Sequence, residues 1–129
     1  MPDTNIVCLL VRKHPQALQR VLAAPIASLC VSAVTGGEMC YGLARRPEAT
    51  PLRLVVAELL KRVDVLPWNS ATAQRYGTIR AALERSDKPL PPLDLMIAAH
   101  ALEVGAVLAT NDRAFERVEG LEVEDWAGP

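Results

Sequence analysis

The chain has 129 residues, of which half are hydrophobic and 22% are charged, a composition that excludes a disordered chain and supplies the core of one domain. The net charge is -1, from 14 basic and 15 acidic residues, so no global field attracts nucleic acid and any contact with RNA has to be local. Aromatic residues make up only 4%, which favours aliphatic helices packed on a sheet over a β-sandwich.

The first part of the chain predicts helices around one buried strand. In order, we expect a helix over the apolar run 6–11, a helix from Pro15 until Pro25, a strand at 26–31 and a helix from Ser32 to about residue 45. The first apolar run suits either a helix or a strand, but Asp3 and Thr4 are good N-caps and favour the helix. Gly36 and Gly37 weaken the helix after Ser32 by about 1 kcal/mol each relative to Ala.

The rest of the chain alternates helices with short strands. We expect a helix at 51–61, a strand at 63–66, a helix from Asn69 or Ser70 to about 85, a loop at 88–92, a helix from about Asp94 until Gly105, a strand at 106–110, a short helix through Phe115 and an edge strand at 121–124. Three prolines prevent a helix at 88–92, and Gly105 is typical of a helix end. This alternation predicts an α/β fold with a mostly parallel central sheet flanked by helices.

Four acidic residues lie where these elements begin or end. Asp3 and Asp94 are expected to open helices, Asp112 follows a strand, and Glu38 lies near the start of a helix that follows another strand. The ligand crevice of an open α/β sheet lies outside the carboxyl ends of its strands, so these acids can meet at one rim. Taken singly, each aspartate is better explained by helix capping or by complementing the helix dipole, and Glu38 by a solvated helix face. Taken together, they indicate an acidic site.

The three cysteines and the termini bear on the compartment. Cys8, Cys30 and Cys40 are odd in number and form no C-x-x-C pair, so we interpret them as buried reduced thiols. The N-terminus lacks a charged region followed by an apolar run, and no uncharged stretch is long enough for a bilayer. We therefore expect a cytoplasmic protein that does not enter a membrane.

The acids lie in motifs that resemble a known family. The motifs are Asp3-Thr4-Asn5, SAVTGGE at 32–38 with Tyr41-Gly42, PLDLMIAAHA at 92–101, TNDRAF at 110–115 and EVEDW at 122–126. They cover nearly the whole chain in the family's order, and the chain resembles the VapC-type PIN-domain toxins of bacterial type II toxin-antitoxin systems. The resemblance implies a single PIN domain over residues 1–129.

The resemblance also implies a chemistry, that of a metal-dependent endoribonuclease acting on tRNA or ribosomal RNA. Asp3, Glu38, Asp94 and Asp112 would form the catalytic and metal-binding pocket, with Asp3 and Asp94 as direct ligands. Four neighbouring carboxylates repel one another unless a divalent cation neutralises them, and oxygen ligands suit Mg²⁺ or Mn²⁺ rather than zinc. A metal-activated water would then attack the phosphodiester and leave a 5′-phosphate and a 3′-hydroxyl.

The implied partners follow from the same likeness. They are an RNA substrate, a cognate VapB-type antitoxin whose tail covers the acids, and a second copy of the chain in a homodimer. Toxin and antitoxin would form a hetero-oligomer that reaches operator DNA only through the antitoxin.

Two features depart from the family pattern. Several apolar residues usually precede the first aspartate as a central strand, whereas here only Met1 and Pro2 do, and Pro2 cannot donate to a ladder. Either the natural chain starts further upstream or the first strand is truncated, and truncation would leave Asp3 poorly fixed. Gly36 and Gly37 are also unusual before Glu38 and would loosen its helix.

Several further residues are candidates for supporting the four acids or for binding RNA. His100 lies about 240° around its helix from Asp94, so we interpret it as a structural or surface residue and a poor general base. Asn5, Thr110 and Asn111 are explained equally by hydrogen bonds to the acids and by turn formation. Cations that could hold RNA phosphates, or else be scattered surface charges, are Arg12, Lys13, Arg45, Arg46, Arg80, Lys88 and Arg113.

Two alternatives stay open. The first is a catalytically impaired PIN-fold module retained for binding an antitoxin helix, with the short start having disabled the site. The second, which we rank lower, is a haloacid-dehalogenase-like phosphatase, whose nucleophilic Asp also follows the first strand. That family's motif needs a second Asp two residues later, where this chain has Asn5.

Overall fold

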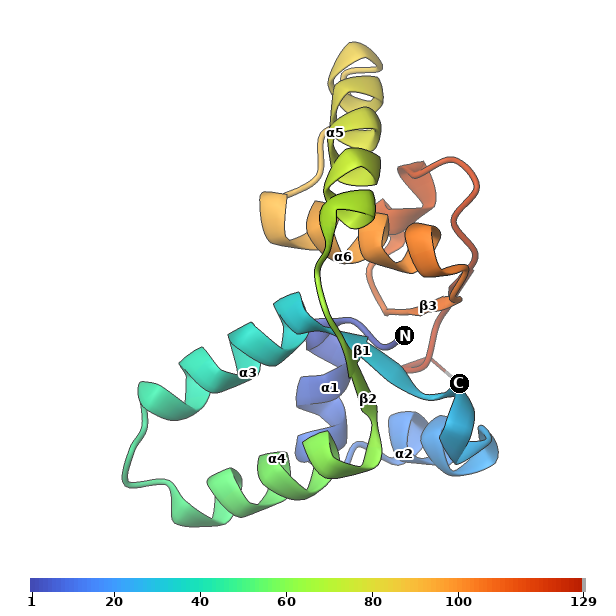
Figure 1. The fold of residues 1–129 in the computed structure, drawn as a ribbon. Coiled ribbons are helices and arrows are strands. Elements are labelled where there is room, and N and C mark those ends of the chain that lie inside the picture. The colour runs from blue at the N-terminus through green and yellow to red at the C-terminus, as the bar shows by residue number, and fades with distance from the viewer. Residues whose placement is uncertain (129) are drawn as a thin grey trace.

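The computed structural model describes residues 1–128. Its helices are α1 (Thr4–Val11), α2 (Pro15–Ala23), α3 (Ala33–Ala44), α4 (Thr50–Arg62), α5 (Ser70–Arg85) and α6 (Pro92–Val104). Its strands are β1 (Cys30–Ser32), β2 (Asp64–Leu66), β3 (Leu108–Ala109) and β4 (Val123–Glu124), with 3₁₀ turns at Ile26–Ser28 and Arg113–Arg117. Figure 1 shows α5 and α6 on one side of the short strands and α3, α1 and α4 on the other.

The helices begin where capping residues predict. The Asp3 carboxylate accepts a hydrogen bond from the backbone N–H of Ile6, and Ser32 caps α3 through the N–H of Val34. Asn69 caps α5 in the same way, and Gly105 ends α6 with a φ of 69°, a conformation that glycine adopts without steric cost. The six predicted helices are thus confirmed, although α6 starts at Pro92 rather than near Asp94.

The strands are parallel, as predicted, but shorter than expected. β1 pairs with β2, and β3 pairs with β4 and with Pro2 through an isolated parallel bridge to Ala109. The pairs form two separate two-stranded sheets rather than one continuous sheet. The predicted first strand is therefore reduced to one bridge at Pro2, a residue that has no N–H to donate towards a second neighbour.

Two predicted strands were too long. Only residues 30–31 of the predicted 26–31 strand lie in β1, because its first part forms a 3₁₀ turn after Pro25, and only two of residues 106–110 form β3. Short apolar runs do not by themselves fix where a ladder starts, because that depends on a partner strand far along the chain.

Helix α1 lies between the apolar clusters. Its neighbouring residues Ile6 and Val7 are both buried, and each belongs to a different cluster. A third cluster packs α6 residues such as Ile97 against Leu108 and Phe115. Within residues 1–128, no helix has both the length and the apolar character that crossing a membrane requires.

The cysteine prediction was only partly right. All three thiols are free, but Cys40 is exposed and Cys8 and Cys30 are only partly buried. Cys40 lies on the outer side of α3, where a small residue needs no apolar partner.

Candidate active site

Asp3 is the most buried of the four acids, with 2% of its surface exposed. Its backbone N–H donates to the carbonyl of Ala109 at 2.9 Å, which continues the bridge at Pro2. One carboxylate oxygen accepts from the N–H of Ile6 and the other from the hydroxyl of Thr110. The expectation that a short first strand leaves Asp3 poorly fixed was therefore wrong, because these bonds hold both its backbone and its carboxylate.

Thr110 connects Asp3 with Asp112. Its hydroxyl donates to Asp3 and accepts from the backbone N–H of Asp112 at 3.0 Å. The Asp112 carboxylate in turn caps the following 3₁₀ turn by accepting from the N–H of Ala114 at 2.9 Å. The hydrogen-bonding role considered for Thr110 is thus confirmed, and Asp112 has the capping role that the sequence also allowed.

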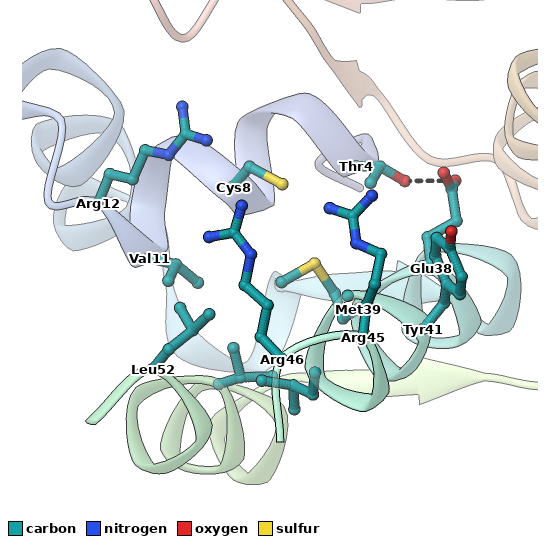
Figure 2. Close-up of a pocket in the computed structure, with 13 residues that line it drawn as sticks. Thr4, Cys8, Val11, Arg12, Glu38, Met39, Tyr41, Arg45, Arg46 and Leu52 are labelled. Atoms are coloured by element: carbon teal, nitrogen blue, oxygen red, sulfur yellow. Dashed lines mark hydrogen bonds between the residues drawn. The ribbon is translucent and has the colours of Figure 1, made fainter. Parts of the chain in front are cut away.

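Glu38 lies in α3 and faces the start of α1. Figure 2 shows the hydroxyl of Thr4 donating to Oε1 of Glu38, at 2.8 Å. The same hydroxyl lies 3.3 Å from the hydroxyl of Thr35, which is fully buried one helical turn before Glu38. Sequence analysis missed Thr4 and Thr35 in this role. The spacing of three between Thr35 and Glu38 was the available signal, since it places both side chains on one face.

Asp94 lies in the first turn of α6 but does not cap it. The N-cap position is Pro91, and no side chain caps this helix, so the capping explanation for Asp94 is wrong. The side chain of Asp94 is partly buried. Its negative charge complements the dipole of α6, and because its carboxylate makes no capping bond, its oxygens are available to an external ligand.

The charges of the four acids act on one another. Burial raises the pKa of Asp3 most, and the negative charges of Asp112 and Glu38 raise it further, against the hydrogen bonds from Thr110 and Ile6. Burial is also the largest cause of the raised pKa of Asp94, followed by the charges of Asp3, Asp112 and Glu38. The charges of Asp3, Glu38 and Asp112 therefore all act on Asp94, and those of Glu38 and Asp112 act on Asp3.

The donor set fits a hard divalent cation. Carboxylate oxygens are the ligands of Mg²⁺ and Mn²⁺, and like charges held together at low solvent exposure favour binding of a cation. Among residues 1–128, no three acidic, histidine or cysteine side chains stand close enough together to hold an ion as they are. Mg²⁺ commonly keeps several waters and takes only one or two carboxylates directly, so this spacing suits it.

His100 has a structural role, as predicted, and it is buried rather than on the surface. Its Nδ1 lies 2.7 Å from the hydroxyl of Ser32, and its ring packs edge-on against Trp68 at a centroid distance of 5.8 Å. Burial lowers the pKa of His100, which keeps the ring neutral. Since Ser32 caps α3 and His100 lies in α6, this hydrogen bond joins the helix of Glu38 to the helix of Asp94.

We expect His100→Ala to lower the free energy of unfolding by about 2–4 kcal/mol, because it removes a buried ring and leaves the Ser32 hydroxyl without its partner. Urea denaturation followed by circular dichroism measures this. His14→Ala is the matched control, since His14 is only partly buried and caps α2 through one long hydrogen bond of 3.4 Å. Equal losses in the two variants would contradict the role assigned to His100.

The asparagines and arginines that the sequence suggested for supporting roles differ in their position relative to the four acids. Asn5 and Asn111 are both exposed. Asn111 lies in a bend before Asp112, which agrees with turn formation, whereas Asn5 lies in the first turn of α1, so turn formation does not describe it. Arg80 lies on α5 and pairs with Glu84 there, at 3.0 Å. Arg12, Arg45 and Arg46 line a pocket that begins at Glu38.

Known proteins resemble this chain over its whole length. The PIN domain family matches residues 1–121. The tRNA(fMet)-specific endonuclease VapC of Shigella flexneri is 39% identical and covers 98% of this chain and 97% of its own. The enzyme of the same name from Salmonella typhimurium is 36% identical, with 98% and 96% covered.

Solved structures agree with this fold. DNA-bound VapBC from Salmonella typhimurium aligns with a TM-score of 0.88 at 34% identity, covering 98% of this chain and 96% of that one. VapBC-1 from nontypeable Haemophilus influenzae aligns with a TM-score of 0.85 at 31% identity, covering 99% and 98%. These complexes support an antitoxin partner, and the family is one of nucleases that are generally metal-dependent.

The fold, the four acids and the relatives lead to one assignment, and this assignment excludes the phosphatase alternative. The chain belongs to the PIN domain family and, within it, to the VapC toxin endoribonucleases of type II toxin-antitoxin systems.

Proposed function

We propose that Asp3, Glu38, Asp94 and Asp112 form the catalytic site of this endoribonuclease, that the site uses Mg²⁺ or Mn²⁺, and that initiator tRNA is the substrate. The observation that carries the site is electrostatic. Burial raises the pKa of Asp94 most, and the charges of the other three acids raise it further, although these acids come from the start of α1, from α3 and from the turn after β3. Such convergence is typical of sites that bind a cation.

Asp3 and Asp94 are the proposed direct ligands. Both oxygens of Asp3 already accept a hydrogen bond from the protein, which fixes the direction of their remaining lone pairs. Asp94 has no capping bond to give up. When bound there, the ion would lower the pKa of a coordinated water and neutralise charge on the reacting phosphate.

Glu38 and Asp112 complete the site by orienting water. Thr4 occupies Oε1 of Glu38, which leaves Oε2 to accept a proton from the attacking water. Thr110 holds the backbone of Asp112, and the N–H of Ala114 holds its carboxylate. Attack on the phosphorus then expels the 3′-oxygen and leaves a 5′-phosphate.

The substrate is inferred from the relatives. Two of them, at 39% and 36% identity, are tRNA(fMet)-specific endonucleases. Sequencing the 5′ ends of the RNA fragments that accumulate when the chain is induced would identify the cleaved RNA. Ends that map to one site in initiator tRNA support the proposal, and ends confined to ribosomal RNA contradict it.

The proposed assembly is a homodimer inhibited by a VapB-type antitoxin that covers the acids. The solved Rickettsia felis complex, VapBC2, is bound to a DNA fragment from its promoter, which supports a toxin-antitoxin hetero-oligomer. We propose that this chain reaches operator DNA only through its antitoxin.

A catalytically impaired module is the competing function. The hydrogen bonds that fix Asp3 argue against it, because the short start has not displaced the first acid. The two functions differ in whether the isolated chain cuts RNA.

We expect the purified chain, freed of antitoxin, to cleave initiator tRNA in Mg²⁺ and to stop when EDTA is added. Gel analysis of the products measures this, and elongator methionine tRNA is the matched control substrate. Fragments should carry a 5′-phosphate, detected by their ligation to an adaptor. A folded chain that cuts neither tRNA in Mg²⁺ or Mn²⁺ would favour the impaired module.

A further inference from the structure

A pocket leads away from the proposed catalytic site between α1, α3 and α4. It has a volume of about 310 Å³ and starts at the hydrogen bond between Thr4 and Glu38. Its floor is apolar and includes Met39, Leu52 and Val56. Arg12 at the end of α1 and Arg45 and Arg46 at the end of α3 lie on its rim.

The rim is a local concentration of positive charge in a chain of net charge -1. Figure 2 shows the Arg45 and Arg46 side chains extending from α3 towards α1, with Arg45 on the side of Glu38. No carboxylate within residues 1–128 forms an ion pair with Arg12, Arg45 or Arg46. Glu38 is the sole acidic residue lining the described pocket, and Thr4 holds one of its oxygens.

An aromatic side chain lies between the acid and the arginines. Glu38, Tyr41 and Arg45 follow one another at spacings of three and four, so they form a ridge along one face of α3. Tyr41 is 65% exposed, and the Arg45 guanidinium lies 5.4 Å from its ring centroid. An exposed ring beside an unpaired guanidinium is suited to stacking an unpaired base while its phosphate is held.

We propose that this pocket binds the RNA strand on one side of the cut, with Tyr41 stacking a base and Arg45 and Arg46 holding successive phosphates. This inference rests on the proposed function. The pocket starts at Glu38, beside the proposed catalytic site, and this favours RNA as its ligand. An RNA strand with one phosphate at the four acids has to continue along a neighbouring surface. RNA phosphates would also give the three arginines the negatively charged partners that they lack within residues 1–128.

The test measures RNA binding separately from cutting. In the Asp94→Asn background, fluorescence anisotropy with labelled initiator tRNA gives the affinity over a range of KCl concentrations. We expect Arg45→Gln with Arg46→Gln to weaken binding by about 10- to 100-fold and to lower the salt slope by about 1.4, as loss of two phosphate contacts on a single strand requires. Arg20→Gln, which removes one positive charge from the exposed face of α2, is the control and should change neither quantity.

The tyrosine is tested by conservative and non-conservative changes in the same assay. Tyr41→Leu should weaken binding by about 5-fold or more without altering the salt slope, and Tyr41→Phe should bind as the parent does. In the chain with Asp94 intact, the two arginine changes should raise KM and leave kcat nearly unchanged. Circular dichroism confirms folding, since all three side chains are exposed.

Several results would overturn the proposal. An unchanged salt slope in the double arginine variant means that these residues touch no phosphate. If that variant binds RNA normally but no longer retains its co-purified antitoxin, the pocket is a peptide-binding groove. Failure of the catalytic assignment is distinguishable, because it shows as undiminished cutting by Asp94→Asn, whereas failure of this inference shows as an unchanged affinity and salt slope in the double arginine variant.

Discussion

Asp94→Asn is expected to lower the rate of RNA cleavage by at least about 100- to 1,000-fold, with the fold unchanged. The amide keeps the size of the side chain but removes the negative charge proposed to bind the metal ion. Since Asp94 makes no capping bond in α6, the variant loses no structural contact of that helix. Single-turnover cleavage of initiator tRNA in saturating Mg²⁺ measures the chemical step.

The matched control is Asp64→Asn, which makes the same chemical change at an exposed position at the start of β2. It should cut at the parental rate. Mg²⁺ should raise the melting temperature of the control, and much less that of Asp94→Asn, because only a bound ligand stabilises the native state. Undiminished cleavage by Asp94→Asn would remove this residue from the site.

The helices were predictable because their signals are local. A capping side chain and the N–H that it satisfies lie within three residues of each other, as at Asp3 with Ile6 and at Asn69 with Thr72. Strand lengths depended on pairing between distant segments, which no short window of sequence contains. This explains why the first half of the predicted strand at 26–31 is a 3₁₀ turn, although the parallel topology was correct.

The candidate site was predictable at its acids and not at their supports. The four acids were found from their places at the ends of predicted elements and from the family's motifs. Thr4 escaped notice because it meets Thr35 and Glu38 only when α1 packs against α3, a contact between residues more than thirty positions apart. The capping explanation failed for Asp94 because α6 begins two residues earlier, at Pro92.

Asp3→Asn should abolish cleavage and yet stabilise the metal-free protein, raising its melting temperature by about 2–5 °C at neutral pH. The single acceptor oxygen of asparagine can keep the hydrogen bond from the N–H of Ile6, and its amide NH2 can donate to the Thr110 hydroxyl, so the cap on α1 remains. What disappears is a buried negative charge held near Glu38 and Asp112. Asp3→Ala is the contrasting variant, because it also removes the cap and leaves the Thr110 hydroxyl without an acceptor, so it should melt below the parent.

The pH dependence separates charge from packing. The pKa of Asp3 is raised in the folded state, so between its unfolded and folded values the native chain binds more protons, and its stability falls as pH rises through that window. The stability advantage of Asp3→Asn over the parent, measured by thermal melts in EDTA, should therefore shrink as the pH is lowered from neutral towards about 4. An advantage that is independent of pH would mean that the amide packs better and that charge is not the cause. Because Mg²⁺ neutralises the same charge, adding it should stabilise the parent and leave Asp3→Asn unchanged. The repulsion among the acids that lowers the stability of the metal-free protein is then also a source of the site's affinity for the ion.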